Sequence, residues 1–239
     1  MKYFKHFPTL TYDGKEVTDI FSRGKIRDLV IEKIELFYRH TLEDEMRPDT
    51  LSYQYYDDYD PVWAIFFANA ISDPFHDWLL SYEDFKNYLI DKYGVDSPKA
   101  IKSSLGTLTS VTTVGTSVTF DSSNRYTPVR VLEILEAPDT PQTRRVIQVV
   151  SENEFIIDSP FNVNYTNVDM NIYTDVHSYY DADGDQIDYD TWLLLPFSDT
   201  TVLTIFDHEV RENESKRNIR LLRSEFINKI QRELQELFS

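Results

Sequence analysis

Cysteine is absent from this 239-residue sequence, and glycine occurs only six times. Without cysteine the chain can form no disulfide, no thiolate metal site and no cysteine nucleophile. The few glycines leave little material for phosphate-binding loops, and the sequence has no Gly-x-Ser-x-Gly elbow and no His-Glu-x-x-His motif. We therefore predict a protein with no enzymatic activity, no catalytic residue and no cofactor.

Basic residues are also scarce, because 24 Lys and Arg stand against 41 Asp and Glu, which gives a formal net charge of -17. Long-range repulsion therefore opposes binding to nucleic acid and to anionic membrane surfaces. No stretch approaches the roughly 20 apolar residues that cross a bilayer, and the first residues lack the apolar run of a signal peptide. We expect neither nucleic acid nor a membrane as a partner.

Potential metal ligands are present but do not form a known pattern. Residues 181–188 alternate carboxylates as calcium loops do, but Gly184 stands at the fourth place instead of the sixth, and Trp192 occupies the twelfth, where the loop needs glutamate. A hairpin turn between Tyr180 and Ile187 is the better interpretation. The histidines lack the paired helical spacing typical of a catalytic zinc site. They are His6, His40, His76, His177 and His208. We predict no metal site.

Aromatic residues are abundant, with 16 Tyr and 15 Phe. Amphipathic rings of this kind are enriched where proteins contact proteins. An aromatic-rich core explains them equally well, and a hydrophobic content of 41% is ample for a packed core. The composition thus indicates a globular chain and leaves both interpretations open.

Residues 1–28 are predicted to form an extended arm. Asp13 and Gly14 indicate a tight turn, because Asp-Gly supplies the positive φ that such turns need. The apolar residues Val17, Ile20 and Phe21 follow this turn. We take these three as candidate partner-binding residues.

Residues 29–104 are predicted to form a small α/β core with a following helix. Strand-favouring residues indicate a strand in the second half of residues 29–42. Helices are expected over 48–56, from Pro61 onward and over 82–93, since proline is tolerated in a first helical turn. Asp49 is placed to cap the first of these helices.

Residues 105–176 change character, because β-branched runs alternate with polar turns. About five short strands at this spacing predict a small closed or half-open β-barrel inserted into another domain. Residues 177–206 are expected to form a hairpin that returns to the core. The predicted fold class is α+β.

The last segment, residues 207–239, is predicted to be one long amphipathic helix. Apolar residues recur along it at steps of three and four. They are Ile219, Leu222, Phe226, Ile230, Leu234 and Leu237. Such a row is how a helix binds a partner's groove, so these residues are candidate partner contacts. Packing on this chain's own core is the equally weighted alternative.

Part of the core resembles a LysM module. The residues that carry this resemblance are 47–52, Tyr55 and Tyr56, 63–65 and 69–74, which follow the order strand, capped helix, second helix and Asn-x-Ile exit. It covers about forty residues. Taken alone, the resemblance implies a glycan-binding protein that attaches to peptidoglycan.

Three further segments, residues 75–81, 17–21 and 213–238, are similar to the baseplate wedge protein 53 family of contractile-tailed bacteriophages. The resemblance implies a structural subunit that carries the LysM-like core without using it on glycan. It also implies several copies per virion, assembly in the host cytoplasm and a place in the tail baseplate. Partners would be other wedge proteins, with the tail hub and the sheath-initiating subunit as further candidates.

A third class of function, a cell-wall hydrolase, would need two carboxylates across a cleft. Asp57, Asp58, Asp60 and Asp77 could supply them, but chance pairs are expected among 41 acidic residues. We therefore rank the wedge subunit first, the glycan-binding protein second and the hydrolase third.

Overall fold

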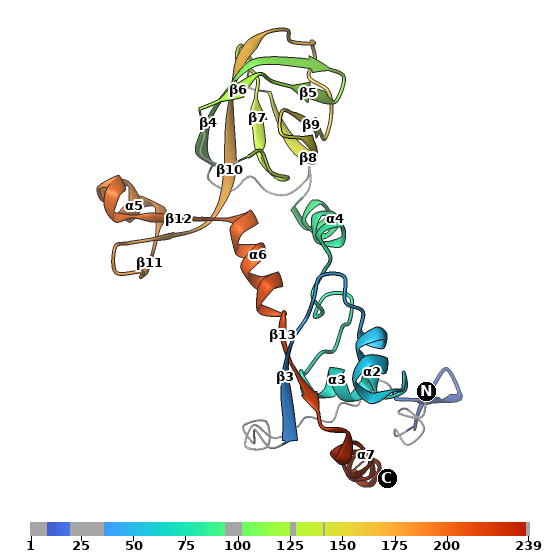
Figure 1. Ribbon diagram of the computed structural model, residues 1–239. Helices are drawn as coiled ribbons and strands as arrows, with labels where there is room; N and C mark the ends of the chain where they lie inside the picture. The colour runs from blue at the N-terminus through green and yellow to red at the C-terminus, as the bar shows by residue number, and fades with distance from the viewer. Residues whose placement is uncertain (1–8, 20–35, 94–101, 125–127, 141, 238–239) are drawn as a thin grey trace. The chain divides into compact units, whose positions relative to one another are not determined.

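The computed structural model describes residues 9–19, 36–93, 102–124, 128–140 and 142–237 (Figure 1). The chain divides into two units. Unit 1 combines residues 1–81 with residues 213–239, and unit 2 comprises residues 82–212. Unit 2 is therefore an insertion in unit 1, but it begins at residue 82, earlier than the predicted start at residue 105. The predicted third helix thus belongs to the insertion.

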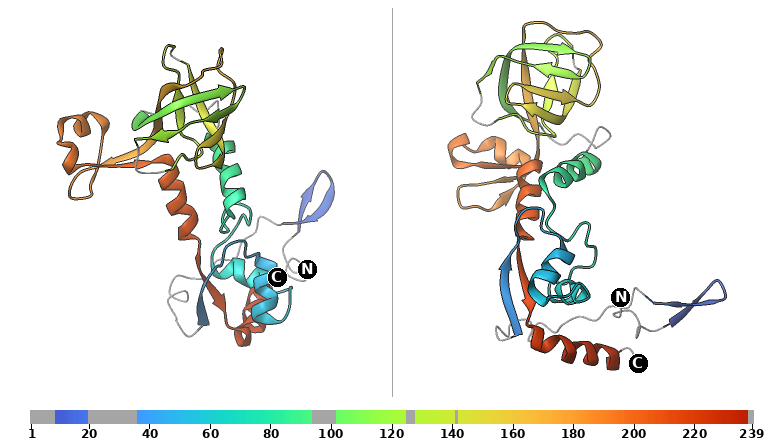
Figure 2. Two further views of the ribbon diagram at one scale, coloured as in Figure 1. Left: turned by 45° about the horizontal axis from the view of Figure 1, so that its top comes forward. Right: turned by 45° about the vertical axis from the view of Figure 1, so that its right-hand side comes forward.

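Unit 1 is built on a two-stranded antiparallel sheet. Strand β3 (Phe37–Thr41) pairs with β13 (Asn218–Leu222), and Phe37 lies opposite Leu222. Helices α2 (Pro48–Tyr56) and α3 (Val62–Ala68) follow β3 along the chain. Figure 2 shows the two strands side by side, with α2 and α3 next to them. The predicted strand and both predicted helices are confirmed.

The ends of these helices differ from the prediction in detail. Arg47 is the N-cap residue of α2 and makes no side-chain capping bond, while Pro48 occupies the first turn. Asp49 forms an ion pair with Arg47 at 3.0 Å, and its Oδ1 accepts from the backbone N–H of Thr50 at 2.9 Å, so Asp49 caps an amide of the first turn as predicted, from inside the helix. The side-chain amide of Asn69, just after α3, donates to the carbonyl oxygen of Arg220 at 2.8 Å and links the helix to β13.

Two apolar clusters form the core of unit 1. The first contains Phe37, Trp63, Ala64, Ala68 and Leu222. The second contains Leu42, Leu51, Ile65, Trp78, Leu79, Ile219 and Leu221. Helix α3 contributes to both clusters, which explains why its sequence is apolar on nearly every side.

Unit 2 contains the predicted β-barrel, which is closed and has six strands where about five were expected. These are β4 (Lys102–Val114), β5 (Ser117–Thr119), β7 (Ile134–Glu136), β8 (Thr143–Ser151), β9 (Glu154–Ile157) and β10 (Val168–Tyr180). They follow the order β10-β7-β8-β9-β5-β4, and pairing of β4 with β10 closes the barrel. The short strand β6 (Ser122–Ser123) pairs with β4.

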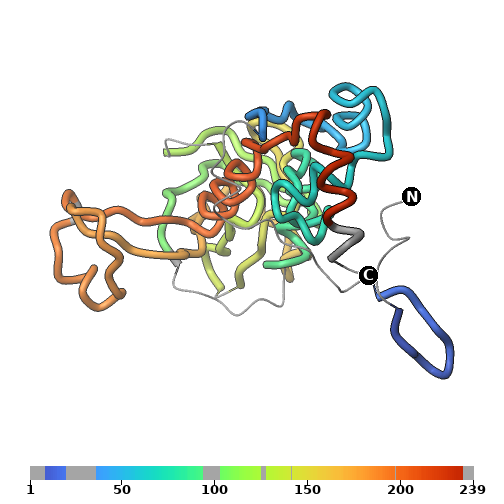
Figure 3. Tube along the Cα trace, turned by 90° about the horizontal axis from the view of Figure 1, so that it is seen from below, coloured from blue at the N-terminus to red at the C-terminus, as the bar shows by residue number. Residues whose placement is uncertain are grey.

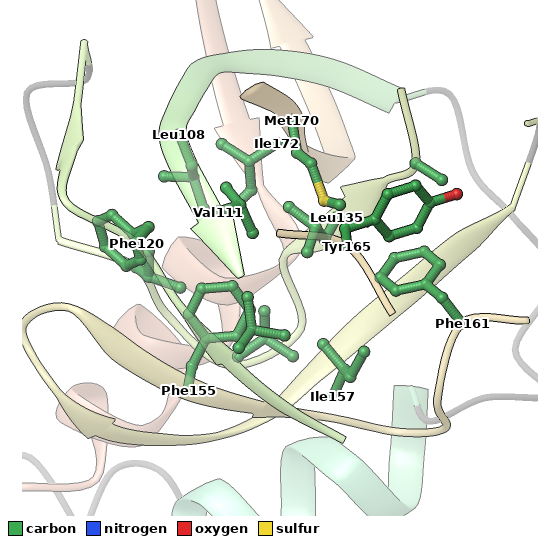
Figure 4. Close-up of a cluster of buried hydrophobic side chains, with 14 residues drawn as sticks. Leu108, Val111, Phe120, Leu135, Phe155, Ile157, Phe161, Tyr165, Met170 and Ile172 are labelled. Carbon is green, nitrogen blue, oxygen red and sulfur yellow. The ribbon is translucent and has the colours of Figure 1, made fainter. Parts of the chain in front are cut away.

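The barrel is filled by side chains that converge from all of its walls (Figure 4). Leu108, Leu135, Phe155 and Ile172 are among the fully buried ones. Closure leaves few strand edges that could pair with other chains. The barrel therefore has a complete core of its own.

The end of β10 continues beyond the barrel. It pairs with β11 (Gln186–Ile187) on one side and with β12 (Thr201–Thr204) on the other. Helix α5 (Tyr189–Leu194) and the short helix η3 (Phe197–Asp199) connect β11 to β12. The predicted hairpin is present, but its chain stays within unit 2 and does not return to the core of unit 1.

The predicted single helix over residues 207–239 is wrong. The chain forms α6 (Ile205–Ser215), strand β13 and α7 (Ser224–Leu237). Strand β13 forms because it pairs with β3. The paired residues Thr41 and Asn218 are 177 positions apart in the sequence. The apolar residues that recur at steps of three and four in the sequence therefore lie partly on β13 and partly on α7. Within the described ranges, no helix is long and apolar enough to cross a membrane.

Candidate partner-binding surfaces

The N-terminal arm contains a β-hairpin. Strand β1 (Thr9–Tyr12) pairs with β2 (Lys15–Thr18), and the turn residues Asp13 and Gly14 both have positive φ, at 50° and 70°. This confirms the turn predicted from Asp-Gly. Every residue of both strands is exposed.

The hairpin carries an apolar pair on its surface. Leu10 lies opposite Val17, and their exposed fractions are 38% and 39%, while Tyr12 is 73% exposed. A two-stranded hairpin without a covering layer is marginally stable in water. The pair containing Val17 is therefore a candidate contact, whereas Ile20 and Phe21 lie outside the described residues.

Helix α7 packs one face on its own unit. Phe226, Ile227 and Ile230 are half-buried against the first apolar cluster of unit 1. For Phe226 and Ile230 the structure thus shows contacts within this chain. Leu234 and Leu237 belong to the same helix, and their side chains lie outside the described residues.

Two other residues of the predicted helical row are buried. Ile219 and Leu222 lie on β13 with exposed fractions of 5% and 0%. They were expected on a helix surface, and the strand turns them into the clusters of unit 1 instead. They therefore serve the core of this chain.

An exposed phenylalanine, which no sequence pattern marks as a contact, lies in the loop after α3. The side chain of Phe75 is 82% exposed. Its backbone N–H donates to Oδ1 of Asp73 at 3.0 Å, and Oδ2 of Asp77 accepts from the backbone N–H groups of Ser72 and Asp73. The aromatic ring is thus presented by a loop that its own carboxylates hold together.

Both carboxylates of this loop are stabilised in the charged form. The hydrogen bond with His76 lowers the pKa of Asp73, and the bond from the backbone N–H of Asp73 lowers the pKa of Asp77. Charged acceptors make the stronger hydrogen bonds. Aspartates two residues on either side of Phe75 are the sequence signal that could have indicated the loop.

A buried carboxylate joins two helices of unit 2. Glu209 on α6 accepts hydrogen bonds from Lys92 at 2.8 Å and from Tyr88 at 3.2 Å, both on α4 (Tyr82–Tyr93). Burial alone would raise the pKa of Glu209, but the bonds from Lys92 and Tyr93 outweigh it and lower the pKa. The cluster is therefore an ion-pair network between α4 and α6.

Glu209→Ala should lower the free energy of unfolding of unit 2 by about 2 kcal/mol, because the half-buried hydroxyls of Tyr88 and Tyr93 lose their acceptor while the half-exposed Lys92 can be hydrated. Since the folded pKa is depressed, the contribution of Glu209 is present at neutral pH and is lost as the pH falls below the ordinary value of 4.5. Urea unfolding at pH 7 and pH 3.5 measures both effects. Asp91→Ala, which removes an exposed carboxylate from α4, is the control and should change stability by less than about 0.5 kcal/mol. An equal loss in both variants would contradict the assignment.

Two of the histidines that are far apart in sequence come together. The rings of His177 and His208 stack with their centroids 3.7 Å apart. Among the residues that the structure describes, no group of three or more His, Asp or Glu is arranged to hold a metal ion. The pair thus packs as two stacked rings beside α6.

Part of the chain is similar to a known protein family. The model of a family described as base plate wedge protein 53 matches residues 9–99, and a search of curated proteins finds no match. The matched region contains the hairpin, β3, α2, α3 and the Phe75 loop, and it ends before the barrel. The match confirms the family that the sequence predicts, and it supports a structural role in a phage baseplate.

Proposed function

We propose, since residues 9–99 belong to the base plate wedge protein 53 family, that this chain is a non-catalytic wedge subunit that binds neighbouring wedge proteins during assembly of a contractile tail. The tail hub and the sheath-initiating subunit are further candidate neighbours. The proposal includes several copies per virion and assembly in the host cytoplasm.

The observation that carries this proposal is the uncovered hairpin of β1 and β2. It lies in the family-matched region, all eight of its strand residues are exposed, and a hairpin alone is marginally stable. A neighbouring subunit that covers Leu10 and Val17, or adds a strand to an edge of the hairpin, would stabilise it. Phe75 offers a second apolar anchor in the same matched region.

The compact part of unit 1 is proposed to act as a LysM-like scaffold for these surfaces. In support, β3, α2 and α3 follow one another in the order that the LysM resemblance implies, and the Asn69 side chain fixes the exit of α3 to β13. Helix α7 extends this scaffold. Leu234 and Leu237 continue its apolar row in sequence and remain proposed partner contacts.

Co-expression with the neighbouring baseplate proteins should give a complex that co-purifies, and Val17→Ser should weaken its affinity about tenfold, as expected for a central interface residue. Val150→Ser is the matched control, because Val150 is an exposed strand valine of the barrel, outside the family match. Equal affinities of the Val17→Ser variant and the wild type would contradict the hairpin contact. Failure of the wild type to co-purify, together with retention on purified peptidoglycan, would favour the glycan-binding alternative.

A further inference from the structure

The part of unit 2 beyond the barrel forms a lobe, which we define as residues 176–204. In Figure 3 it is the orange arm traced out along β10 and back along β12. Val176 pairs with Thr204, and Tyr180 pairs with Thr201 on one side and Gln186 on the other. The lobe is therefore a small three-stranded sheet that carries α5.

Aromatic packing holds α5 on this sheet. The ring centroid of Trp192 lies 4.9 Å from that of Tyr179 and 5.9 Å from that of Tyr189. The start of α5 is fixed as well, because Oδ1 of Asp188 accepts from the backbone N–H of Thr191 at 2.8 Å. The orientation of the helix is thus determined by contacts within the lobe.

This packing leaves three consecutive leucines exposed at the end of α5. Leu193, Leu194 and Leu195 have exposed fractions of 56%, 86% and 37%. Single exposed apolar residues are common, but a contiguous group on an ordered element indicates an interaction site. Among the described side chains of the lobe none covers the leucines, which leaves them open to another molecule.

The leucines are surrounded in sequence by carboxylates of one sign. Residues 181–200 contain six aspartates and no Lys or Arg. The carboxylates of Asp183, Asp185 and Asp190 make no hydrogen bond or ion pair with any part of the chain that the structure describes, since Asp183 and Asp185 bond only through their backbone groups. A molecule that covers the leucines therefore meets uncompensated negative charge, which a basic surface would complement.

The charge also discriminates between possible occupants. A second copy of this chain would bring a lobe of the same sign and a formal charge of -17. Anionic lipid and nucleic acid would be repelled for the same reason. A protein with an apolar groove flanked by Lys and Arg satisfies both features of the lobe.

We propose that the lobe is a docking site for a different baseplate protein, one that receives Leu193, Leu194 and Leu195 in an apolar groove with a basic rim. The inference rests on the proposed baseplate function and extends it to the lobe, which lies outside the family match. The barrel then supports a second binding surface, separate from the hairpin of unit 1.

The absence of cysteine makes a direct test simple, because Leu194→Cys introduces a single thiol. Its rate of labelling by a maleimide is measured in the free subunit and in wedges assembled by co-expression with the neighbouring baseplate proteins. We expect labelling at residue 194 to slow at least about tenfold on assembly, while the control Val150→Cys keeps its rate. Unchanged labelling at residue 194, or equal protection at both positions, would overturn the proposal.

Charge reversal tests the chemistry of the partner. The variant Asp183→Lys with Asp190→Lys should bind the wedge proteins at least about tenfold more weakly at low salt, and the difference should shrink at high salt, where such charges are screened. A photo-cross-linker attached to residue 194 should capture a different chain next to Lys or Arg. Capture of a second copy, or no effect of the charge reversal, would overturn the proposal. If the wild type assembles while residue 194 stays freely labelled, this inference alone fails, whereas a wild type that does not assemble refutes the proposed function as well.

Discussion

Replacing Phe155 with alanine is expected to lower the free energy of unfolding of the barrel by about 3–5 kcal/mol, the usual cost of a buried Phe→Ala change. Phe155 lies on β9 and is fully buried, and its ring centroid is 6.0 Å from that of Phe120. Removing the ring leaves a cavity between strands that closure of the barrel holds apart. The neighbouring side chains therefore cannot collapse fully into the space.

Hydrogen exchange of peptides from β8 and β9 in the full chain measures this effect, because it reports the stability of the barrel separately from that of unit 1. Phe75→Ala is the matched control, since it removes the same side chain at a position that is 82% exposed. The control should change stability by less than about 0.5 kcal/mol. A loss below about 1 kcal/mol for Phe155→Ala would show that Phe155 is not central to the barrel core.

The elements that the sequence predicts well are those with local signals. Pro48 marks the start of α2, and helix α4 has the bounds that its pattern predicts. The turn at Asp13 and Gly14 and the turn after Tyr180 are predicted correctly, because residues that favour positive φ are a signal visible within a few positions. The barrel was found from its strand spacing.

The elements that the sequence does not predict depend on distant partners. Strand β13 is stabilised by β3 and by the side chain of Asn69, so no window around residue 218 contains its cause. Leu222 consequently looked like a helix-surface residue and is instead fully buried. The predicted start of unit 2 is wrong for the same reason. Helix α4 belongs to unit 2 because Glu209, 117 positions after Lys92, binds it.

Of the candidate site, the sequence predicts the turn at Asp13 and Gly14 and Val17 as a candidate contact, and it misses the strand pairing of the hairpin and the leucines of the lobe. In the sequence, Trp192 to Leu195 is an uninterrupted apolar stretch. The structure exposes it because Tyr179 and Tyr189 already occupy the inner side of Trp192. Exposure is a property of the packed lobe, which apolar content alone does not reveal.

Asp175→Leu is expected to lower the free energy of unfolding of the barrel by about 3–5 kcal/mol, because it leaves the charge of Arg145 buried without its partner. Nη1 of Arg145 lies 2.8 Å from Oδ2 of Asp175, and the two side chains are only 8% and 7% exposed. The same nitrogen also donates to the carbonyl oxygen of Leu132 at 3.0 Å. This second bond cannot compensate for the lost carboxylate.

The double variant Arg145→Met with Asp175→Leu separates the contribution of the ion pair to barrel stability from its contribution to strand register. Taking both charges out of water is costly, so an apolar pair of similar volume should restore stability to within about 1–2 kcal/mol of the wild type. In the double-mutant cycle, the double variant should thus be much more stable than the sum of the two single changes predicts. A double variant as unstable as Asp175→Leu would contradict this account.

The ion pair joins β8 to β10 where β10 leaves the barrel and continues into the lobe, since Asp175 is followed directly by Val176, which pairs with β12. If an apolar pair supports the barrel equally well, the benefit of the charged pair lies in fixing the register of β10. A shift by one residue would turn Tyr179 away from Trp192 and release α5. We therefore expect the double variant to fold stably but to show faster hydrogen exchange in β12 and α5 than the wild type. Unchanged exchange there would mean that the barrel strands alone determine the register.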